Sequence, residues 1–288
     1  MKLIRASVCG YCMGVERAIK KTFQEAVSHP EKKIVTLGPL IHNPNTLAKL
    51  EQRGVYSIET PNEIADPHNT IVIIRAHGVP PKLEKEILQT GASIVDATCP
   101  KVHMSQKMAQ DYEKAGYRII IAGEKNHSEI IGILGYATSA MVVLDIDEAL
   151  EIAHRIKETD GSPTKVVLLA QTTYSESKFA EMVSALKEIL PNLEVAHTIC
   201  KATRERQESL YNLCKLVDAV LVIGGKKSAN TQRLKAIAEE QGLPVWLIED
   251  ERDLPEAIYQ FDTVGLTAGA STPKELIDRI ESILSNSQ

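Results

Sequence analysis

Three of the five cysteines, Cys12, Cys99 and Cys200, recur at intervals of about one third of the 288-residue chain. Each one follows a short apolar segment and precedes a stretch with helical periodicity, so each thiol is expected at a helix N-terminus. The positive end of a helix dipole favours a thiolate, the form of cysteine that binds metals. Three thiolates with no fourth protein sulfur suit an iron–sulfur cluster with one open iron. A three-cysteine zinc site with an exchangeable water is the competing interpretation.

The other two cysteines fit this pattern less well. Cys9 forms a C-x-x-C motif with Cys12, which is typical of redox dithiols and zinc half-sites. A second C-x-x-C motif is missing from the sequence, which weakens the zinc interpretation, and we assign Cys9 no role. Cys214 lies within a predicted helix between Leu213 and Val217, so we expect it to be a core residue.

Histidines and hydroxyl residues follow the predicted strands at matching places in the three parts of the chain. After each cysteine's helix comes a further predicted strand, and the loop that follows this strand contains His42, His127 or Ser228. A later strand in each part ends near His77, Thr172 or Ser271. Ligands of parallel α/β sheets bind beyond the carboxyl ends of the strands, so all of these residues are candidates for ligand binding.

Two further features suggest the kind of ligand. Glu129 stands two residues after His127, and a partly desolvated glutamate that holds its proton near neutral pH suits a proton donor. Ser228, Asn230 and Ser271, with nearby glycines, form a predicted anion nest before a helix expected at 231–241. The P-loop motif is missing from the sequence, so we expect a phosphate or diphosphate on a small molecule rather than a nucleoside triphosphate.

Alternating strands and helices have to position these side chains. Strands are predicted to lead to the cysteines at 2–12, 93–99 and 193–200, with helices after them at 14–28, 102–115 and 203–217. Buried strands are predicted next, at 33–37, 118–122 and 219–223. This alternation indicates α/β architecture with βαβ units and parallel sheets.

The pattern repeats three times. We predict similar α/β units at 1–97, 98–195 and 196–288, the last with a C-terminal tail. The third unit lacks a closing strand of its own, and the N-terminal strand is expected to supply it. The repeats would then close into a pseudo-three-fold ring around one centre.

The bulk composition narrows the class of protein. Hydrophobic residues make up 43% and charged residues 25% of the chain, as in ordinary globular proteins. A net charge of −5 argues against nucleic acid as a partner, and the lack of a basic run argues against a membrane surface. Apolar stretches are strand-sized and the N-terminus does not resemble a signal peptide, so a cytoplasmic protein is expected. Five cysteines in such a protein indicate metal-binding or catalytic thiols rather than disulfides.

Short motifs along nearly the whole chain resemble those of the 4-hydroxy-3-methylbut-2-enyl diphosphate reductase family. They are CMGVERA at 12–18, IHN at 41–43, RAHG at 75–78, DATCP at 96–100, HSE at 127–129, QTT at 171–173, TIC at 198–200 and TAGAS at 267–271. The resemblance implies a trefoil of three α/β domains around a central [4Fe–4S] cluster. It also implies an iron–sulfur oxidoreductase in the last step of the methylerythritol phosphate route to isoprenoids.

In the implied reaction, two electrons and two protons remove the hydroxyl of an allylic diphosphate as water, giving isopentenyl or dimethylallyl diphosphate. The implied electron donor is ferredoxin or flavodoxin. By matching positions, Cys12, Cys99 and Cys200 would hold three irons, and the fourth iron would bind the hydroxyl of the substrate. Glu129 would deliver protons, and His127 and Thr172 would line the pocket. The diphosphate would be gripped by His42, His77, Ser228, Asn230 and Ser271.

One motif departs from the family, because many members have Ser-Ser-Asn where this chain has Ser228-Ala229-Asn230. One hydroxyl is lost, although the backbone N–H of Ala229 can still contact phosphate. Two other classes of protein stay open. A zinc-dependent hydrolase or lyase predicts zinc without acid-labile sulfide, and a redox-sensing regulator or cluster carrier predicts a cluster with no use for the anion nest.

Overall fold

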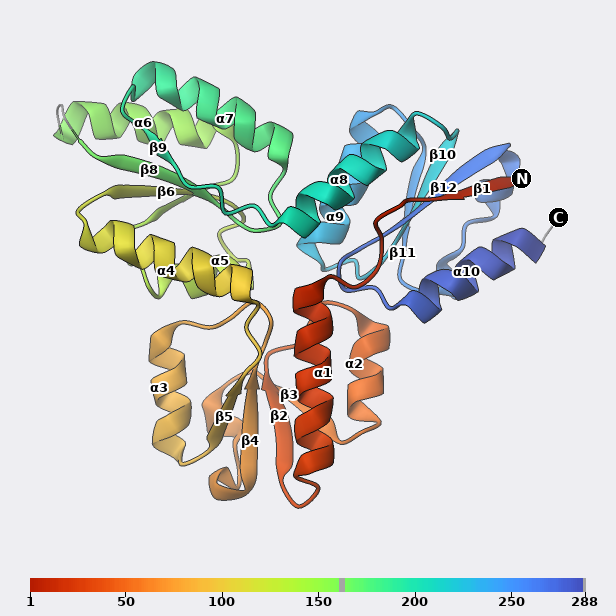
Figure 1. Ribbon diagram of the computed structural model, residues 1–288, viewed down its shortest axis with the longest axis horizontal. Helices are drawn as coiled ribbons and strands as arrows, with labels where there is room; N and C mark the ends of the chain where they lie inside the picture. The colour runs from red at the N-terminus through yellow and green to blue at the C-terminus, as the bar shows by residue number, and fades with distance from the viewer. Residues whose placement is uncertain (161–163, 287–288) are drawn as a thin grey trace. The chain divides into compact units, whose positions relative to one another are not determined.

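The structure is a computed structural model that describes residues 1–160 and 164–286. Its strands divide, within those residues, among three four-stranded sheets, and the architecture is α/β (Figure 1). Residues 287–288, the end of the predicted C-terminal tail, lie outside the description. The described helices include none long and apolar enough to cross a membrane.

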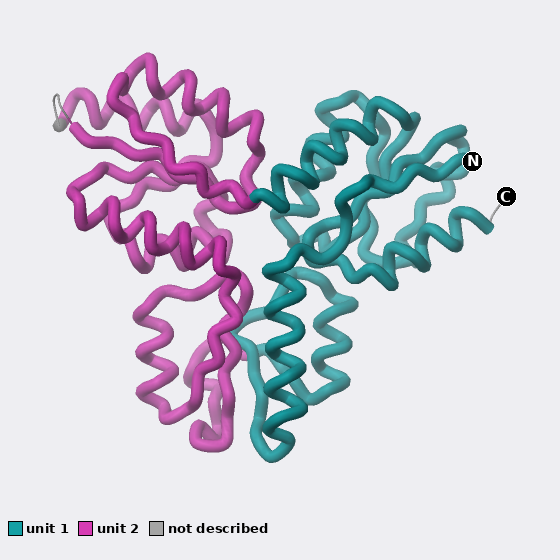
Figure 2. The backbone as a smooth tube through the Cα atoms, viewed as in Figure 1, with its two compact units in different colours: residues 1–57, 201–288 teal, residues 58–200 magenta. Residues whose placement is uncertain are grey.

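The chain forms two compact units (Figure 2). Unit 1 combines residues 1–57 with residues 201–288, and unit 2 is the continuous stretch 58–200. Unit 1 is therefore built from both ends of the chain. The division into three repeats at 1–97, 98–195 and 196–288 stays a prediction.

Unit 1 contains a parallel sheet in the order β1-β12-β10-β11. Apolar residues of β10 alternate between its two faces: Val220 and Val222 pack with α8 and α9, whereas Leu221 and Ile223 pack with α10. The sheet is therefore buried on both sides, as expected of parallel strands. Its elements are β1 (Lys2–Arg5), α8 (Lys201–Cys214), β10 (Ala219–Ile223), α9 (Ala229–Glu240), β11 (Val245–Ile248), β12 (Thr263–Ala268) and α10 (Lys274–Asn286).

The N-terminal strand completes this sheet, as the repeat predicts. β1 runs parallel to β12 and pairs Lys2 with Thr263 and Arg5 with Leu266. After β1, unit 1 continues with α1 (Met13–Ser28), β2 (Lys33–Leu37), α2 (Pro44–Glu51) and β3 (Val55–Ile58), at its boundary with unit 2.

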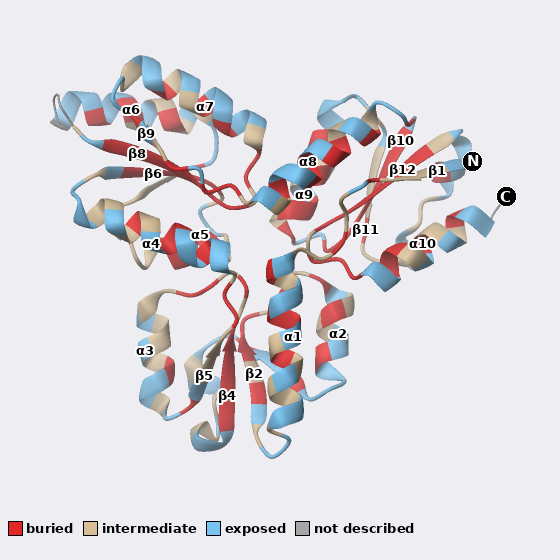
Figure 3. Ribbon diagram, viewed as in Figure 1, coloured by how far each residue is buried: buried red, intermediate tan, exposed pale blue. Residues whose placement is uncertain are grey.

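Unit 2 contains a parallel sheet in the order β7-β6-β8-β9. Helices α4 and α5 pack on one face of β6 through Ile119 and Ile121, and α6 and α7 cover the face with Ile120. Figure 3 shows β6 and β8 as buried strands with exposed residues on the outer sides of the helices. The elements are α4 (Pro100–Lys114), β6 (Arg118–Ala122), α5 (Ser128–Leu134), β7 (Met141–Val143), α6 (Ile146–Asp160), β8 (Val166–Ala170), α7 (Glu176–Ile189) and β9 (Glu194–Val195).

Unit 2 also holds β4 (Thr70–Ile74), α3 (Pro81–Thr90) and β5 (Ser93–Asp96), in which β4 and β5 pair in parallel. Short 3-10 helices occupy Pro61–Glu63, Pro67–Asn69, Glu251–Asp253 and Glu256–Gln260.

The strands that lead to the cysteines are shorter than predicted. They end at Arg5, Asp96 and Val195, several residues before Cys12, Cys99 and Cys200. The intervening residues leave the regular ladder; Gly10, for example, has a left-handed φ of 87°. A left-handed residue turns the chain out of the extended path, and glycine adopts it without steric cost.

Candidate functional site

The three predicted cluster cysteines share one local geometry. Cys12 is the N-cap of α1, Cys99 is the N-cap of α4, and Cys200 directly precedes α8. All three are partly buried. Each cysteine N–H donates to a carbonyl just beyond the neighbouring strand, at 3.0 Å in every case: Cys12 to Ala270, Cys99 to Ala76 and Cys200 to Thr172. Three copies of one turn thus present a thiol at the start of a long helix.

These bonds also correct the alignment of the repeats. They make Thr172 the counterpart of Ala76 and Ala270, so the counterpart of His77 and Ser271 is Thr173. The sequence pattern matches Thr172 with His77 and Ser271, one residue before the true counterpart, because Thr172 and Thr173 are identical neighbours. Thr173 is partly buried, and its hydroxyl accepts a hydrogen bond from Gln171 Nε2 at 2.9 Å.

Glu129 and Thr172 form a buried pair within unit 2. Glu129 lies in the first turn of α5 and is 1% exposed. One carboxyl oxygen accepts from the Thr172 backbone N–H at 2.7 Å, and the other accepts from Thr172 Oγ1 at 2.7 Å. Burial raises the pKa of Glu129 to about 7, against the opposing effect of both Thr172 bonds. Glu129 is therefore a buried carboxyl that exchanges its proton near neutral pH, as the desolvation argument expected.

Two histidines lie in the same part of unit 2. His127 is the N-cap of α5, and its Nδ1 accepts from the Glu129 backbone N–H at 3.1 Å. In the neutral ring the proton then sits on Nε2. The His77 and His127 rings meet edge to face, with centroids 5.3 Å apart. Unit 2 therefore brings together His77, His127, Glu129 and Thr172.

Unit 1 brings together His42, Ser271 and the loop after β10. Ser271 Oγ donates to the His42 carbonyl at 3.3 Å. Gly225 follows β10, and a Cβ built on it would lie 2.1 Å from the same carbonyl. That distance is far inside van der Waals contact, so this close approach requires glycine.

Ser228 and Asn230 stand at the N-terminus of α9. Ser228 is the N-cap, and its side chain accepts from the Thr231 backbone N–H at 3.4 Å. Asn230 is 5% exposed, and within the described residues its Nδ2 has no hydrogen-bond partner. A buried donor without a partner costs free energy, which a bound acceptor such as phosphate oxygen would recover. Lys226 in the same loop forms an ion pair with Asp253.

The cysteines fit a metal cluster by their chemistry. Three thiols at helix N-termini are the donors that iron–sulfur clusters use. They divide between the units, with Cys12 in unit 1 and Cys99 and Cys200 in unit 2. Within residues 1–160 and 164–286, no three His, Cys, Asp or Glu side chains are placed to hold a metal ion. The cluster itself therefore stays a prediction.

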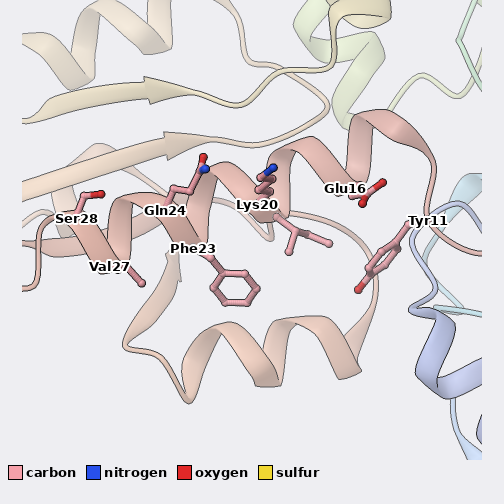
Figure 4. Close-up of a pocket in the computed structure, with 8 residues that line it drawn as sticks. Tyr11, Glu16, Lys20, Phe23, Gln24, Val27 and Ser28 are labelled. Atoms are coloured by element: carbon pink, nitrogen blue, oxygen red, sulfur yellow. The ribbon is translucent and has the colours of Figure 1, made fainter.

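A groove of about 530 Å³ runs along α1 in unit 1 (Figure 4). Its walls include Tyr11, Phe23 and Val27, with Glu16 and Lys20 among the polar residues. The groove contains none of the predicted site residues, and we do not regard it as the candidate site.

Sequence reasoning missed Arg206, a fully buried cation of unit 1. Arg206 lies on α8 and is 2% exposed. Its spacing in the sequence could have identified it as buried. One face of α8 is buried at helical intervals and consists of Thr203, Arg206, Leu210 and Leu213. An arginine on a buried face is costly unless its charge is compensated.

Comparisons with known proteins agree on one family. The family model described as LytB protein matches residues 3–285. A protein of Treponema denticola named 4-hydroxy-3-methylbut-2-enyl diphosphate reductase is 44% identical over 286 residues, which cover 98% of both chains. One with the same name from Solidesulfovibrio magneticus is 41% identical over 293 residues, covering 99% of each chain.

Two solved structures are also similar. The E-1-hydroxy-2-methyl-but-2-enyl-4-diphosphate reductase of Plasmodium falciparum superposes with a TM-score of 0.90 at 29% identity, covering 99% of this chain and 88% of its own. A structure of (E)-4-hydroxy-3-methyl-but-2-enyl diphosphate reductase, described as the terminal enzyme of the non-mevalonate pathway, has a TM-score of 0.69 at 34% identity. The match covers 99% of this chain and 100% of that one.

Proposed function

The chain belongs to the LytB protein family, and on that basis we propose that it reduces 4-hydroxy-3-methylbut-2-enyl diphosphate. The reaction consumes two electrons and two protons, breaks the allylic C–O bond and releases water. Its products are isopentenyl diphosphate and dimethylallyl diphosphate. The naming of full-length relatives as this reductase supports the assignment.

The observation that carries the mechanism is the Glu129–Thr172 pair. A carboxyl group that is 1% exposed, with a pKa raised to about 7 by burial, holds a proton that it can release near neutral pH. Removing a hydroxyl as water requires protonation of a poor leaving group, which is the work of a general acid. Thr172 fixes both carboxyl oxygens and thereby orients the acid.

Cys12, Cys99 and Cys200 would hold a [4Fe–4S] cluster, and that cluster would supply the electrons. The repeated turn that ends each cysteine segment supports this assignment, because it presents three soft donors at helix N-termini. We propose ferredoxin or flavodoxin as the electron donor. We also propose that the enzyme works in the cytoplasm, where thiols stay reduced.

The diphosphate would bind to His42, His77, Ser228, Asn230 and Ser271, and His127 and Thr172 would line the pocket. The unpartnered Nδ2 of Asn230 and the positive end of α9 support the phosphate assignment. The hydroxyl expected of many family members at position 229 is replaced here by an alanine. The backbone N–H of Ala229, at the start of α9, is the remaining donor at that place.

Glu129→Gln tests the proposal. We expect the anaerobically purified variant to contain as much iron and acid-labile sulfide as wild type, about four of each per chain. Its kcat for the diphosphate substrate should fall by about 100- to 10,000-fold, because a general acid contributes on that scale. Glu113→Gln is a matched control, since Glu113 is a partly buried carboxylate outside the proposed site that also accepts from a backbone N–H and a hydroxyl, both of Ser139. Near-wild-type turnover by Glu129→Gln would disprove the role of Glu129, and zinc without sulfide would disprove the reductase mechanism.

A further inference from the structure

Arg206 joins the backbone segment that leads to Cys12 with the segment that leads to Ala270, the backbone partner of Cys12. Its Nη1 donates to the Ala268 carbonyl and its Nη2 donates to the Gly10 carbonyl, each at 2.8 Å. Two residues further along each segment, the Cys12 N–H donates to the Ala270 carbonyl. The guanidinium therefore holds the loop that ends in Cys12 against the end of β12.

The same helix holds this loop at a second place, without charge. Ser209 Oγ lies 2.9 Å from Ser7 Oγ and accepts from the Val8 backbone N–H at 3.1 Å. Neutral side chains are thus sufficient to attach the loop to α8. The charge of Arg206 calls for a separate explanation.

Burying a guanidinium is costly unless an anion compensates it. The two carbonyls that accept from Arg206 are neutral, and its Nε has no hydrogen-bond partner within the described residues. Burial lowers the pKa of Arg206, and the groups that act in the opposite direction are the thiols of Cys12 and Cys9. Gly10, which accepts from Arg206, lies two residues before Cys12 in the chain, so the balancing negative charge is expected at the cluster that Cys12 would help to hold.

We propose that Arg206 is a positioning residue that places a permanent, buried positive charge beside Cys12 and thereby raises the reduction potential of the cluster that Cys12 would help to hold. The inference rests on the proposed function for the presence of that cluster. A fixed positive charge favours the more negative, reduced form of a redox centre, and cluster potentials depend on local charge and hydrogen bonding. Arginine suits this role because it keeps its charge when buried.

The test is an anaerobic redox titration of the holoprotein, monitored by electron paramagnetic resonance, on wild type and four variants, with Arg206→Gln as a fifth in case Arg206→Met does not load. Arg206→Met removes the charge at similar length, and Arg206→Lys keeps the charge with fewer donors. Ser209→Ala loosens the same loop without changing charge. Arg5→Met removes a cation that donates to Cys9 Sγ at 3.2 Å but is paired with Asp278 and Glu281.

We expect Arg206→Met to lower the reduced-to-oxidised ratio at a fixed potential by tenfold or more, which is a shift of at least 59 mV for one electron. Arg206→Lys should recover most of that shift, and Ser209→Ala and Arg5→Met should stay close to wild type. Iron and sulfide content, with circular dichroism, identifies any variant that fails to fold or load. If Arg206→Met does not load, a lowered potential in Arg206→Gln together with a wild-type potential in Arg206→Lys would support the inference. A wild-type potential in Arg206→Gln, or a shifted potential in Arg206→Lys, would overturn it.

The result separates this inference from the proposed function. A loaded wild type whose potential is unchanged by loss of the Arg206 charge overturns the inference alone. An equal shift in Ser209→Ala would also overturn it, because loop position rather than charge would then set the potential. Wild-type protein without iron and sulfide would overturn the proposed function, and this inference with it.

Discussion

Glu129 is the residue whose protonation should control the rate. Its pKa is raised to about 7 by burial, and the proposed role requires the protonated form. As pH rises through 7 that form is lost, so kcat should fall about tenfold for each further pH unit. A pH–rate profile under anaerobic conditions measures this alkaline limb. A rate that stays constant from pH 6 to pH 9 would contradict the assignment.

Thr172 should tune the same titration. Its hydroxyl and its backbone N–H both stabilise the carboxylate of Glu129 and so oppose the effect of burial on the pKa. Thr172→Val removes the hydroxyl donor and keeps the backbone donor. We expect the alkaline limb of kcat to move to higher pH, with a lower maximum because Glu129 loses its orientation. Thr172→Ser keeps the hydroxyl and is the control; an identical pH profile in Thr172→Val and wild type would show that the bond is unimportant.

At the scale of elements, the N-terminus of α9 carries the proposed phosphate contact. Ser228→Ala removes an N-cap, which costs about 1 kcal/mol of unfolding free energy, and it also removes a proposed phosphate donor. Substrate KM should therefore rise about tenfold while iron content is unchanged. Ser175 caps α7 with the same 3.4 Å acceptor geometry, so Ser175→Ala should lose similar stability at constant KM. Equal KM values in the two variants would mean that Ser228 is only a cap.

The inner strands of the units could be predicted from the sequence alone. The apolar runs at 33–37, 118–122 and 219–223 are strands with those same bounds, because a strand buried on both faces needs a continuous apolar run. The segments before the cysteines were predicted too long. Their apolar residues continue past the end of the ladder, where Gly10 turns the backbone and each cysteine N–H bonds to a neighbouring loop. Apolar content does not distinguish residues that pair in a regular strand ladder from residues that bond singly to a neighbouring loop.

The candidate site was predictable in composition but not in its internal contacts. Strand-end position alone identified His77, His127 and Glu129 as candidates. The pairing of Glu129 with Thr172 could not be found this way, because it depends on the packing of α5 against the end of β8. Arg206 was missed for a related reason: the residues that bond to it, Gly10 and Ala268, lie far away in the sequence and contribute only backbone carbonyls.

At the scale of the whole molecule, the three repeats are expected to contribute equally to metal binding. Cys12→Ser, Cys99→Ser and Cys200→Ser should each leave less than about a quarter of wild-type iron, since a cluster with one open iron has no spare protein ligand. Cys214 is the last residue of α8 and packs against the core that includes β10, and burial raises its pKa, so Cys214→Ser should load normally. Iron and sulfide analysis after anaerobic purification distinguishes these outcomes, and full loading of any of the first three variants would exclude that cysteine as a ligand.

The construction of unit 1 from both ends of the chain has a consequence for synthesis on the ribosome. Compact units generally fold as they emerge, and unit 2 is one continuous stretch, so it is complete before α9, β11 and β12 exist. The sheet of unit 1 cannot be completed until β12 has been synthesised, because β1 pairs with β12. Cys12 is therefore the first of the three thiols to be translated and the last to reach its native backbone partner, Ala270, whereas Cys99 and Cys200 find Ala76 and Thr172 within unit 2. Until β12 and Ala270 have been synthesised and released, two of the three cysteines can form their native backbone hydrogen bonds and Cys12 cannot.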